Sequence, residues 1–239
     1  GLWQDQTEHL KWLLPPTKCW PEEGVVEGGG WVNLPLLLST WRTRLIDEGR
    51  FEQRPYQDDD GRGLSHGTWD AVVDCRGTAT GLDTQMPQLD IRANRGELLT
   101  VEQQAHSINP PDAHILNFGK WTIPTSAGQW RLGASYEWNR TDLDPTAGTQ
   151  QFLLNALDSA VPGIGQLKVT QHLVGLRPVS RDRRPAVGPY PGLPGWFVLN
   201  GLGTRGVLIG PRWALHLMNI IAGDSTATTE TQPNRLIFG

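Results

Sequence analysis

The sequence predicts a mixed fold with both α+β and α/β character, and two observations carry this prediction. Strand-length apolar segments alternate with helical segments near both ends of the chain. In the middle, from residue 95 onward, apolar and polar residues alternate between turn residues, which is typical of antiparallel strands. The chain has 239 residues, of which 38% are hydrophobic, and this is enough for one large or two small domains with a core.

The first part of the chain contains one well-marked helix. Asn33 is a favourable cap, Pro35 lies in the first turn, and Gly49 ends the segment. Before it we expect a short helix at Thr7–Leu14 and a short strand at Val25–Glu27. The capped helix is amphipathic, with an apolar face made of Leu34, Leu37, Leu38, Trp41 and Leu45.

A strand is expected at Trp69–Cys75, and it leads directly into Gly77. A glycine at the carboxyl end of a strand marks the place where α/β sheets meet cofactors. The same pattern is common in ordinary turns, and both interpretations stay open at this point.

The middle of the chain predicts an antiparallel sheet followed by a helix and a longer strand. The expected strands are Gly96–Glu102, His114–Phe118, Trp121–Pro124 and Trp130–Tyr136. They are followed by a helix at Thr149–Ala160, a strand at Leu167–Leu176, an arginine- and proline-rich loop at Arg177–Arg184, and a carboxy-terminal segment at Pro233–Phe238 that docks back.

The most informative segment is Trp196–Gly206, an apolar run that breaks into three glycines just before a helix at Val207–Ala222. Its letters fit G-x-G-x-x-G, but a dinucleotide fingerprint belongs at the head of a βαβ unit, and only one helix and a tail follow here. The segment is therefore expected to be a strand, glycine turn and helix outside any Rossmann unit. Such a turn brings backbone N–H groups close to an electron-rich ligand, or it packs tightly without one.

Composition excludes several classes of function. The net charge of −4 argues against a nucleic-acid partner, no run is long and apolar enough for a membrane span, and two distant cysteines favour a reducing cytoplasm. We expect no metal site and name no catalytic acid or base. Five histidines have no carboxylate at a sequence spacing that would indicate a catalytic pair: His66, His106, His114, His172 and His216.

Several motifs together resemble one family. They are, in order, Gly29-Gly30-Trp31, Asp70–Gly77, Arg95-Gly96-Glu97, Leu132–Tyr136, Gly175–Pro178, Arg181–Gly188 and Asn200–Pro211. They resemble the D-amino-acid-oxidase-like superfamily of FAD-dependent oxidoreductases, which includes glycine oxidase, sarcosine oxidase and the oxidoreductase half of the tRNA-modifying enzyme MnmC. The resemblance covers nearly the whole chain.

The resemblance implies an antiparallel substrate-domain sheet together with the carboxy-terminal part of a glutathione-reductase-like FAD-binding domain. Residues 1–94 would be the remainder of the FAD-binding domain interleaved with substrate-domain elements, 95–176 the substrate domain, and 177–239 the return to the FAD-binding domain. Nothing here matches the family's amino-terminal FAD-binding βαβ unit, and the chain opens without methionine. We therefore expect a carboxy-terminal portion that lacks this segment.

The resemblance also implies roles for individual residues. Arg177 would hold a substrate carboxylate, Tyr136 would line the substrate pocket, and Gly77 would let its strand approach the diphosphate of FAD. The glycine turn and the start of the last helix would pass beside the flavin ring, with their N–H groups facing it. The residues implied there are Gly201, Leu202, Gly203, Thr204, Arg205, Gly206 and Val207.

The implied reaction is oxidation of a small amine or amino acid by hydride transfer to flavin. The candidate substrates are glycine, sarcosine, a D-amino acid, a proline-like amine and a modified nucleoside. Two alternatives stay open: an MnmC-like enzyme that acts on tRNA, and a truncated, non-catalytic relative that binds no flavin.

Overall fold

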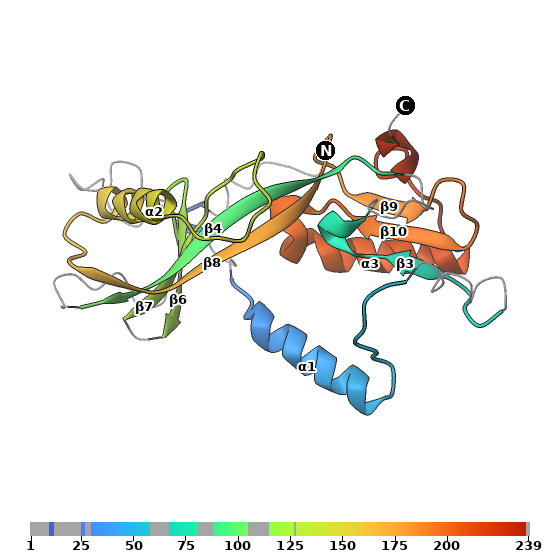
Figure 1. The fold of residues 1–239 in the computed structure, drawn as a ribbon, viewed down its shortest axis with the longest axis horizontal. Coiled ribbons are helices and arrows are strands. Elements are labelled where there is room, and N and C mark those ends of the chain that lie inside the picture. Colours follow the sequence, from blue (N-terminus) through green and yellow to red (C-terminus); the bar gives the residue numbers. More distant parts are fainter. Residues whose placement is uncertain are drawn as a thin grey trace. The chain divides into compact units, whose positions relative to one another are not determined.

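The computed structural model describes residues 10–11, 25–26, 30–57, 67–80, 88–104, 115–126 and 128–237 (Figure 1). The chain divides into two compact units, which are described one at a time. The first unit comprises Gly1–Arg54, Glu97–Ala134 and Pro145–Leu173, and the second unit comprises Pro55–Gly96, Ser135–Asp144 and Val174–Gly239.

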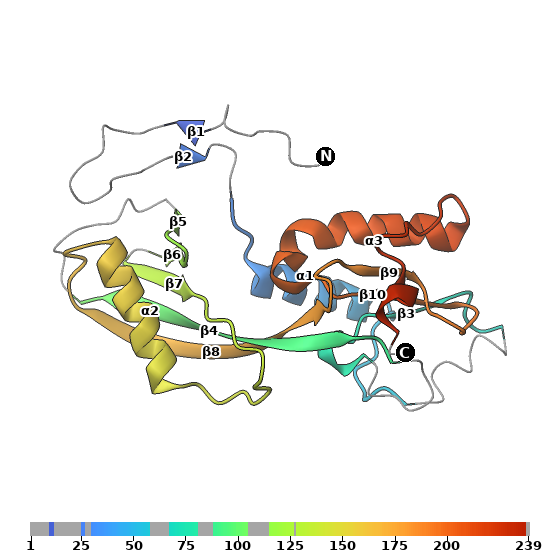
Figure 2. The same ribbon diagram turned by 90° about the horizontal axis from the view of Figure 1, so that it is seen from above.

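A five-stranded sheet supplies the core of the first unit. Its strand order is β5 (Leu116–Asn117), β6 (Trp121–Ser126), β7 (Gln129–Gly133), β4 (Ile91–Gln103) and β8 (Leu167–Ser180), and the two long strands β4 and β8 continue into the second unit. Helix α2 (Ala147–Ala160) packs on β7, as Figure 2 shows. The buried core is formed by Leu99, Val101, Trp130, Leu132, Leu153, Leu157, Val161 and Ile164. The expected antiparallel pairing of the middle segment is confirmed for β5, β6, β7 and β4.

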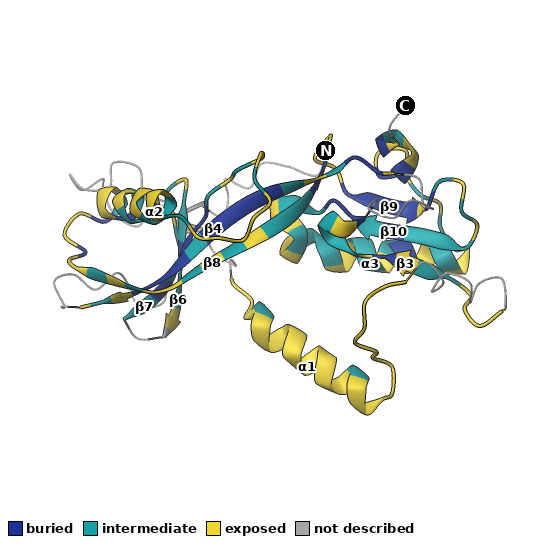
Figure 3. Cartoon of the chain, in the orientation of Figure 1, coloured by how far each residue is buried: buried dark blue, intermediate teal, exposed yellow. Residues whose placement is uncertain are grey.

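The capped helix near the start of the chain is confirmed as α1 (Leu34–Asp47). The side chain of Asn33 accepts a hydrogen bond from the Leu36 N–H at 3.2 Å, so the cap works as the sequence predicts. No residue of α1 is buried, and Figure 3 shows the helix exposed over most of its surface. The apolar face is therefore present, but no described segment covers it.

The helix expected at Thr7–Leu14 is wrong where the structure describes it. Leu10–Lys11 forms β1, which pairs antiparallel with β2 (Val25–Val26), and the rest of the predicted helix lies outside the described residues. The partner strand is distant in sequence, and such pairing overrides a local preference for helix. The strand expected at Val25–Glu27 is confirmed at its first two residues.

The second unit contains a three-stranded sheet in the order β3 (Val72–Asp74), β10 (Trp196–Asn200), β9 (Ala186–Pro189). Strands β3 and β10 are parallel, whereas β9 pairs antiparallel with β10. Helix α3 (Gly206–Ala222) follows β10 and packs against β9 and β10 (Figure 2). The strand, glycine turn and helix predicted at Trp196–Ala222 are therefore confirmed, and so is the mixed fold class.

Two elements of the second unit differ from the expectation. Strand β8 extends to Ser180, so Arg177 lies in a strand rather than in a loop, and Val179 forms a bridge with Leu202. Pro178 has no N–H, and a strand tolerates it where no ladder hydrogen bond requires one. Strand β9 was not expected, because its four residues are recognisable as a strand only through their pairing with β10.

The carboxy-terminal segment docks back as predicted. Pro233–Leu236 forms a short 3-10 helix, Leu236 is fully buried, and Ile237 bridges to Leu89. Arg235 fixes this segment by an ion pair with Asp182, in which Nε lies 2.6 Å from Oδ2.

The sheet core predicts a sharp contrast between two neighbouring residues of α2. Replacing the fully buried Leu153 by alanine should lower the free energy of unfolding by about 2–5 kcal/mol, because it leaves a cavity among packed side chains. Phe152→Ala should lower the free energy of unfolding by less than about 1 kcal/mol, because that residue is half exposed. Its ring contact with the Lys120 ammonium, 5.1 Å from the ring centre, adds little to this loss. Urea denaturation followed by circular dichroism measures both, and equal losses would contradict the assigned core.

Candidate functional site

Two glycine turns lie at the carboxyl ends of the neighbouring parallel strands β3 and β10. Gly77 follows β3 with φ +64°, and Gly201 and Gly203 follow β10 with φ +68° and +58°. A residue with a Cβ rarely adopts these angles, so the turns require glycine. Because β3 and β10 are parallel, both turns lie at the same end of the sheet, which is where open α/β sheets hold their ligands.

Asn200 joins the two turns. Its Nδ2 donates to the Gly77 carbonyl at 2.8 Å and to Thr80 Oγ1 at 2.6 Å, while its Oδ1 accepts from the Gly201 N–H at 2.7 Å. Asn200 is 3% exposed, so these bonds are shielded from water. The relative position of the two glycine turns therefore depends on one buried side chain.

A buried carboxylate extends this network under the first turn. Asp74 is 3% exposed and accepts hydrogen bonds from the Arg76 N–H, from Thr80 Oγ1 and from the Arg76 guanidinium, with Nη2 3.0 Å from Oδ2. The turn that carries Gly77 is thus fixed from both sides, by Asp74 and by Asn200.

The start of α3 suits an electron-rich planar group. One short 3-10 turn, Gly203–Arg205, leads into the helix, and no described side chain caps its first N–H groups. Val207 and Leu208 are exposed there and flank the helix end with apolar surface. Uncapped amides and the positive end of the helix dipole attract partial negative charge, and apolar side chains pack against a ring. These residues fit the flavin part of FAD.

Packing alone accounts for one of the glycines. A Cβ on Gly201 would lie 3.2 Å from Ser180 Cβ and 3.4 Å from Ile91 Cδ1, so this position needs glycine even without a ligand. Thr204 and Arg205 are exposed, and Arg205 donates to the Arg183 carbonyl at 3.4 Å. Leu202 and Gly203 lie against β8, where Val179 forms the bridge to Leu202.

The same bridge brings Arg177 near the second glycine turn. Arg177 is two residues before Val179 on β8, and a strand rises about 3.3 Å per residue, so their Cα atoms are roughly 7 Å apart with side chains on one face. Pro178 between them lies 3.8 Å from where a Gly77 Cβ would be. Arg177 and the two glycine turns therefore belong to the second unit, where Val179 pairs with Leu202 of the second turn and Pro178, on the opposite side of β8 from Arg177, lies next to Gly77.

Arg177 is half-buried, and its partners in the described part of the chain are neutral. Its Nη1 donates to Asn94 Oδ1 at 3.1 Å and to the Ser135 carbonyl at 3.2 Å, and its guanidinium carbon lies 4.7 Å from the centre of the Tyr136 ring. No carboxylate among the described residues pairs with it. Burial lowers the pKa of the Arg177 guanidinium, because its charge is partly removed from water. Binding an anion lowers the free energy of such a partly desolvated cation.

Gly96 provides the space in which this guanidinium lies. A Cβ at Gly96 would overlap the Arg177 Nη1, Nη2 and Cζ atoms. Tyr136 lies beyond the end of β7, contrary to the predicted strand Trp130–Tyr136, and its ring is 54% exposed beneath the guanidinium. The structure thus places both predicted substrate-side residues, Arg177 and Tyr136, in direct contact.

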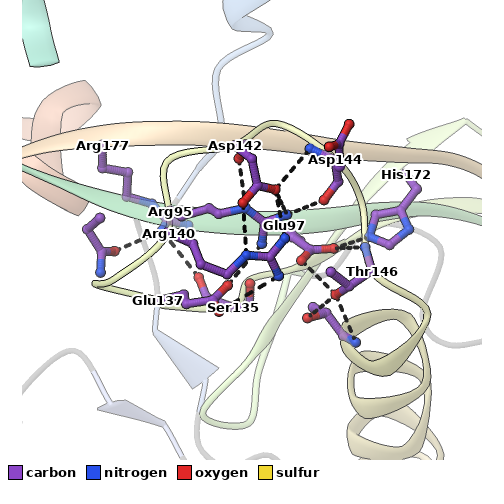
Figure 4. Close-up of polar contacts among 12 residues, drawn as sticks. Arg95, Glu97, Ser135, Glu137, Arg140, Asp142, Asp144, Thr146, His172 and Arg177 are labelled. Carbon is purple, nitrogen blue, oxygen red and sulfur yellow. Dashed lines mark hydrogen bonds and ion pairs between the residues drawn. The ribbon is translucent and has the colours of Figure 1, made fainter. Parts of the chain in front are cut away.

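A fully buried arginine, which the sequence analysis missed as a functional residue, fixes the loop that carries Tyr136 (Figure 4). Arg95 donates from Nε to the Asp142 carbonyl at 2.9 Å, from Nη1 to Glu137 Oε2 at 3.0 Å, and from Nη2 to the Asp144 carbonyl. Its backbone also exchanges two hydrogen bonds with Glu137. Loop Ser135–Asp144 is therefore fastened to β4 beside Arg177. The Arg-Gly-Glu motif marks this position in the sequence but does not reveal the loop contact.

Among the histidines that the structure describes, His172 has a carboxylate partner, contrary to the expectation from spacing. In the first unit, His172 Nε2 lies 2.6 Å from Glu97 Oε2, and the fully buried Glu97 also accepts hydrogen bonds from the Thr146 N–H and hydroxyl at 2.9 Å each (Figure 4). Glu97 and His172 are 75 positions apart, so only the fold brings them together. Thr146 also caps α2, because its hydroxyl accepts a hydrogen bond from the Thr149 N–H. The contacts among Glu97, Thr146 and His172 therefore have a structural role.

The parallel strand pair that ends in glycine turns lies where open α/β sheets hold their ligands, and an antiparallel sheet accompanies it. A family model described as FAD dependent oxidoreductase, DAO, matches residues 3–219. The chain therefore belongs to this family of FAD-dependent oxidoreductases.

Individual relatives match over shorter stretches. Glycine oxidase from Pseudomonas aeruginosa is 28% identical over 109 residues, 46% of this chain and 30% of the relative. The tRNA 5-methylaminomethyl-2-thiouridine biosynthesis bifunctional protein MnmC from Caulobacter sp. (strain K31) is 34% identical over 104 residues, 42% of this chain and 17% of the relative.

A solved structure has the same fold. The crystal structure of glycine oxidase from Geobacillus kaustophilus superimposes with a TM-score of 0.57 at 24% identity, and the match covers 70% of this chain and 46% of that one. The chain thus spans less than half the length of the relatives that it matches.

The Asn200 network predicts a local effect on both glycine turns. Asn200→Ala removes three hydrogen bonds and leaves the Gly77 carbonyl without this donor, which should lower the free energy of unfolding by about 1–3 kcal/mol. Amide hydrogen exchange should accelerate at Gly77–Ala79 and Gly203–Arg205 together. The exposed Asn219→Ala on α3 is the control and should change neither quantity. Faster exchange in one turn alone would contradict the coupling.

Proposed function

We propose that this chain supplies the amine-substrate side and part of the flavin side of an FAD-dependent oxidoreductase that oxidises a small amino acid. The observation that carries the proposal is the half-buried Arg177 guanidinium, whose partners among the described residues are neutral, in the same unit as the glycine turns. A carboxylate is the ligand that suits a planar cation held in this way, since it accepts two parallel charge-assisted hydrogen bonds. The glycine oxidase relative supports the choice of an amino acid.

Two residues of the chain would bind and orient the substrate. Arg177 would hold the carboxylate, and Tyr136, whose ring lies against the guanidinium, would form one wall of the substrate site. When bound, FAD would supply the redox chemistry by which the amine is oxidised. An amine that enters neutral requires no general base, and we assign none.

On the flavin side, the proposal assigns the turn after β10 and the start of α3. Their N–H groups would stabilise negative charge on the reduced ring, and Gly77 would allow the diphosphate to approach the end of β3. The residues assigned to the cofactor are Gly77, Gly201, Leu202, Gly203, Thr204, Arg205, Gly206 and Val207. The division of residues 1–94, 95–176 and 177–239 between cofactor and substrate parts belongs to the same proposal.

A second candidate substrate is a modified tRNA nucleoside, since MnmC is among the relatives. The net charge of −4 supports the small-molecule candidate instead, because tRNA binding relies on clustered basic residues. The described helices include none that is both long and apolar enough to cross a membrane. A cytoplasmic location belongs to the proposal and rests on cysteine usage alone.

The assignment of Arg177 predicts a selective loss of substrate affinity. In the intact, FAD-loaded enzyme, Arg177→Ala should lower kcat/KM for glycine, sarcosine, D-alanine or L-proline about 100-fold, mainly through KM, because truncating one partner of a buried charge pair costs about 2–5 kcal/mol. The flavin spectrum should not change. The matched control is Arg212→Ala on the exposed face of α3. Unchanged steady-state kinetics in the Arg177 variant would remove this residue from the site.

Flavin content separates the enzymatic proposal from a non-catalytic relative. The purified intact protein should show the absorbance of an oxidised flavin, and an added amino acid should bleach it in the absence of oxygen. A protein that binds tRNA tightly and loses this affinity with rising salt would favour the second candidate. A protein that folds but neither retains nor takes up FAD would overturn both enzymatic readings.

A further inference from the structure

Asn94 contains a buried donor that no described residue satisfies. The side chain is 1% exposed, its Oδ1 accepts from Arg177 Nη1 at 3.1 Å, and its Nδ2 has no hydrogen-bond partner among the residues that the structure describes. The orientation of the amide follows from its neighbour, because a guanidinium only donates and therefore faces the amide oxygen. A buried donor without a partner costs free energy, and native structures rarely keep one without a reason.

The strand geometry directs Asn94 and Gly96 to the same target. Both residues lie on β4 two positions apart, so they face the same side of the strand. On that side Asn94 binds the Arg177 guanidinium, and Gly96 leaves the space that the guanidinium occupies. Asn94 Nδ2 belongs to the same planar amide group as Oδ1, the atom that contacts Arg177, so the amide offers a neutral donor in addition to the cationic one.

We propose that Asn94 is a second binding residue for the substrate's acid group, and that its Nδ2 donates to one carboxylate oxygen while Arg177 binds the other. The proposal rests on the proposed function of Arg177. A carboxylate has two oxygens with several acceptor positions, and one anion satisfies both the orphaned amide and the partly desolvated guanidinium. An amine without an acid group satisfies neither, so the pair selects amino acids over simple amines.

The surrounding contacts keep this pair in place. The Ser135 carbonyl accepts from Arg177 Nη1 at 3.2 Å, and Arg95 fastens the loop that carries Ser135 to β4. Figure 4 shows Arg177 reaching Ser135 beside this loop. Gly96 completes the arrangement, because a side chain there would push the guanidinium away from Asn94. Asn94 is thus the group that contacts substrate, whereas Arg95 and Gly96 are positioning residues.

The test compares substrates that differ only in the carboxylate. In the intact FAD-loaded enzyme, Asn94→Leu should raise KM for glycine or L-proline about 10-fold or more, since it deletes a hydrogen bond to a charged group. KM for methylamine or pyrrolidine should change less than about two-fold. Asn94→Ser retains a hydroxyl oxygen that can accept from Arg177, but its side chain is too short to donate to the substrate carboxylate. This variant serves for the same comparison if the leucine variant does not fold. Equal changes for both kinds of substrate would overturn the proposal.

A chemical readout is independent of turnover. Phenylglyoxal modifies accessible arginines, and peptide mass spectrometry measures the rate at Arg177. Acetate should protect Arg177 in the wild-type protein and protect it at least several-fold less in the Asn94→Leu or Asn94→Ser variant. Full protection in both variants would exclude Asn94 as a ligand while leaving the role of Arg177 intact. If Arg177→Ala itself leaves KM unchanged, the proposed function fails rather than this inference alone.

Discussion

The candidate site depends on how a partly buried guanidinium is accommodated without a carboxylate. Arg177 has an amide oxygen, a backbone carbonyl and an aromatic ring as its neighbours, and each stabilises the cation without neutralising it. Removing a charge from water is costly, and burial therefore lowers the pKa of the Arg177 guanidinium from its ordinary value. A carboxylate among its partners would relieve the cost but would also compete with an anionic ligand. The neutral environment among the described residues therefore leaves the positive charge of Arg177 uncompensated, as the proposed binding of a substrate carboxylate requires.

The placement of this group depends on the long strands β4 and β8. Three successive residues of β4 serve Arg177 in different ways: Asn94 binds it, Arg95 fastens the neighbouring loop, and Gly96 gives it room. The alternation of side chains along a strand explains why Asn94 and Gly96 face Arg177 while Arg95 faces the loop. On β8, the bridge between Val179 and Leu202 connects the same arginine to the turn after β10.

The cofactor side has an independent source of rigidity. Glycine has a wide range of backbone conformations and no side chain to pack, so glycine turns by themselves hold the carboxyl ends of β3 and β10 only weakly. Asn200 offsets this by bonding to both turns from a buried position, and Asp74 fixes the first turn from the other side. Such hydrogen bonds are strong in a site that excludes water. The two turns are thereby held at one end of the sheet, as the proposed cofactor site requires.

The sequence by itself determined the parts of this protein that depend on local chemistry. The Asn33 cap, the helix after Gly206, the alternation of the antiparallel strands and the glycines after two strands were all recognisable, because capping, periodicity and turn residues act over a few positions. Tertiary structure alone decided the rest. It extended β8 through Arg177, paired β1 with β2, brought His172 to Glu97 and left Asn94 Nδ2 beside Arg177. Each of these depends on residues far apart in the chain, and no local pattern specifies which distant group will satisfy a backbone edge or a buried polar atom.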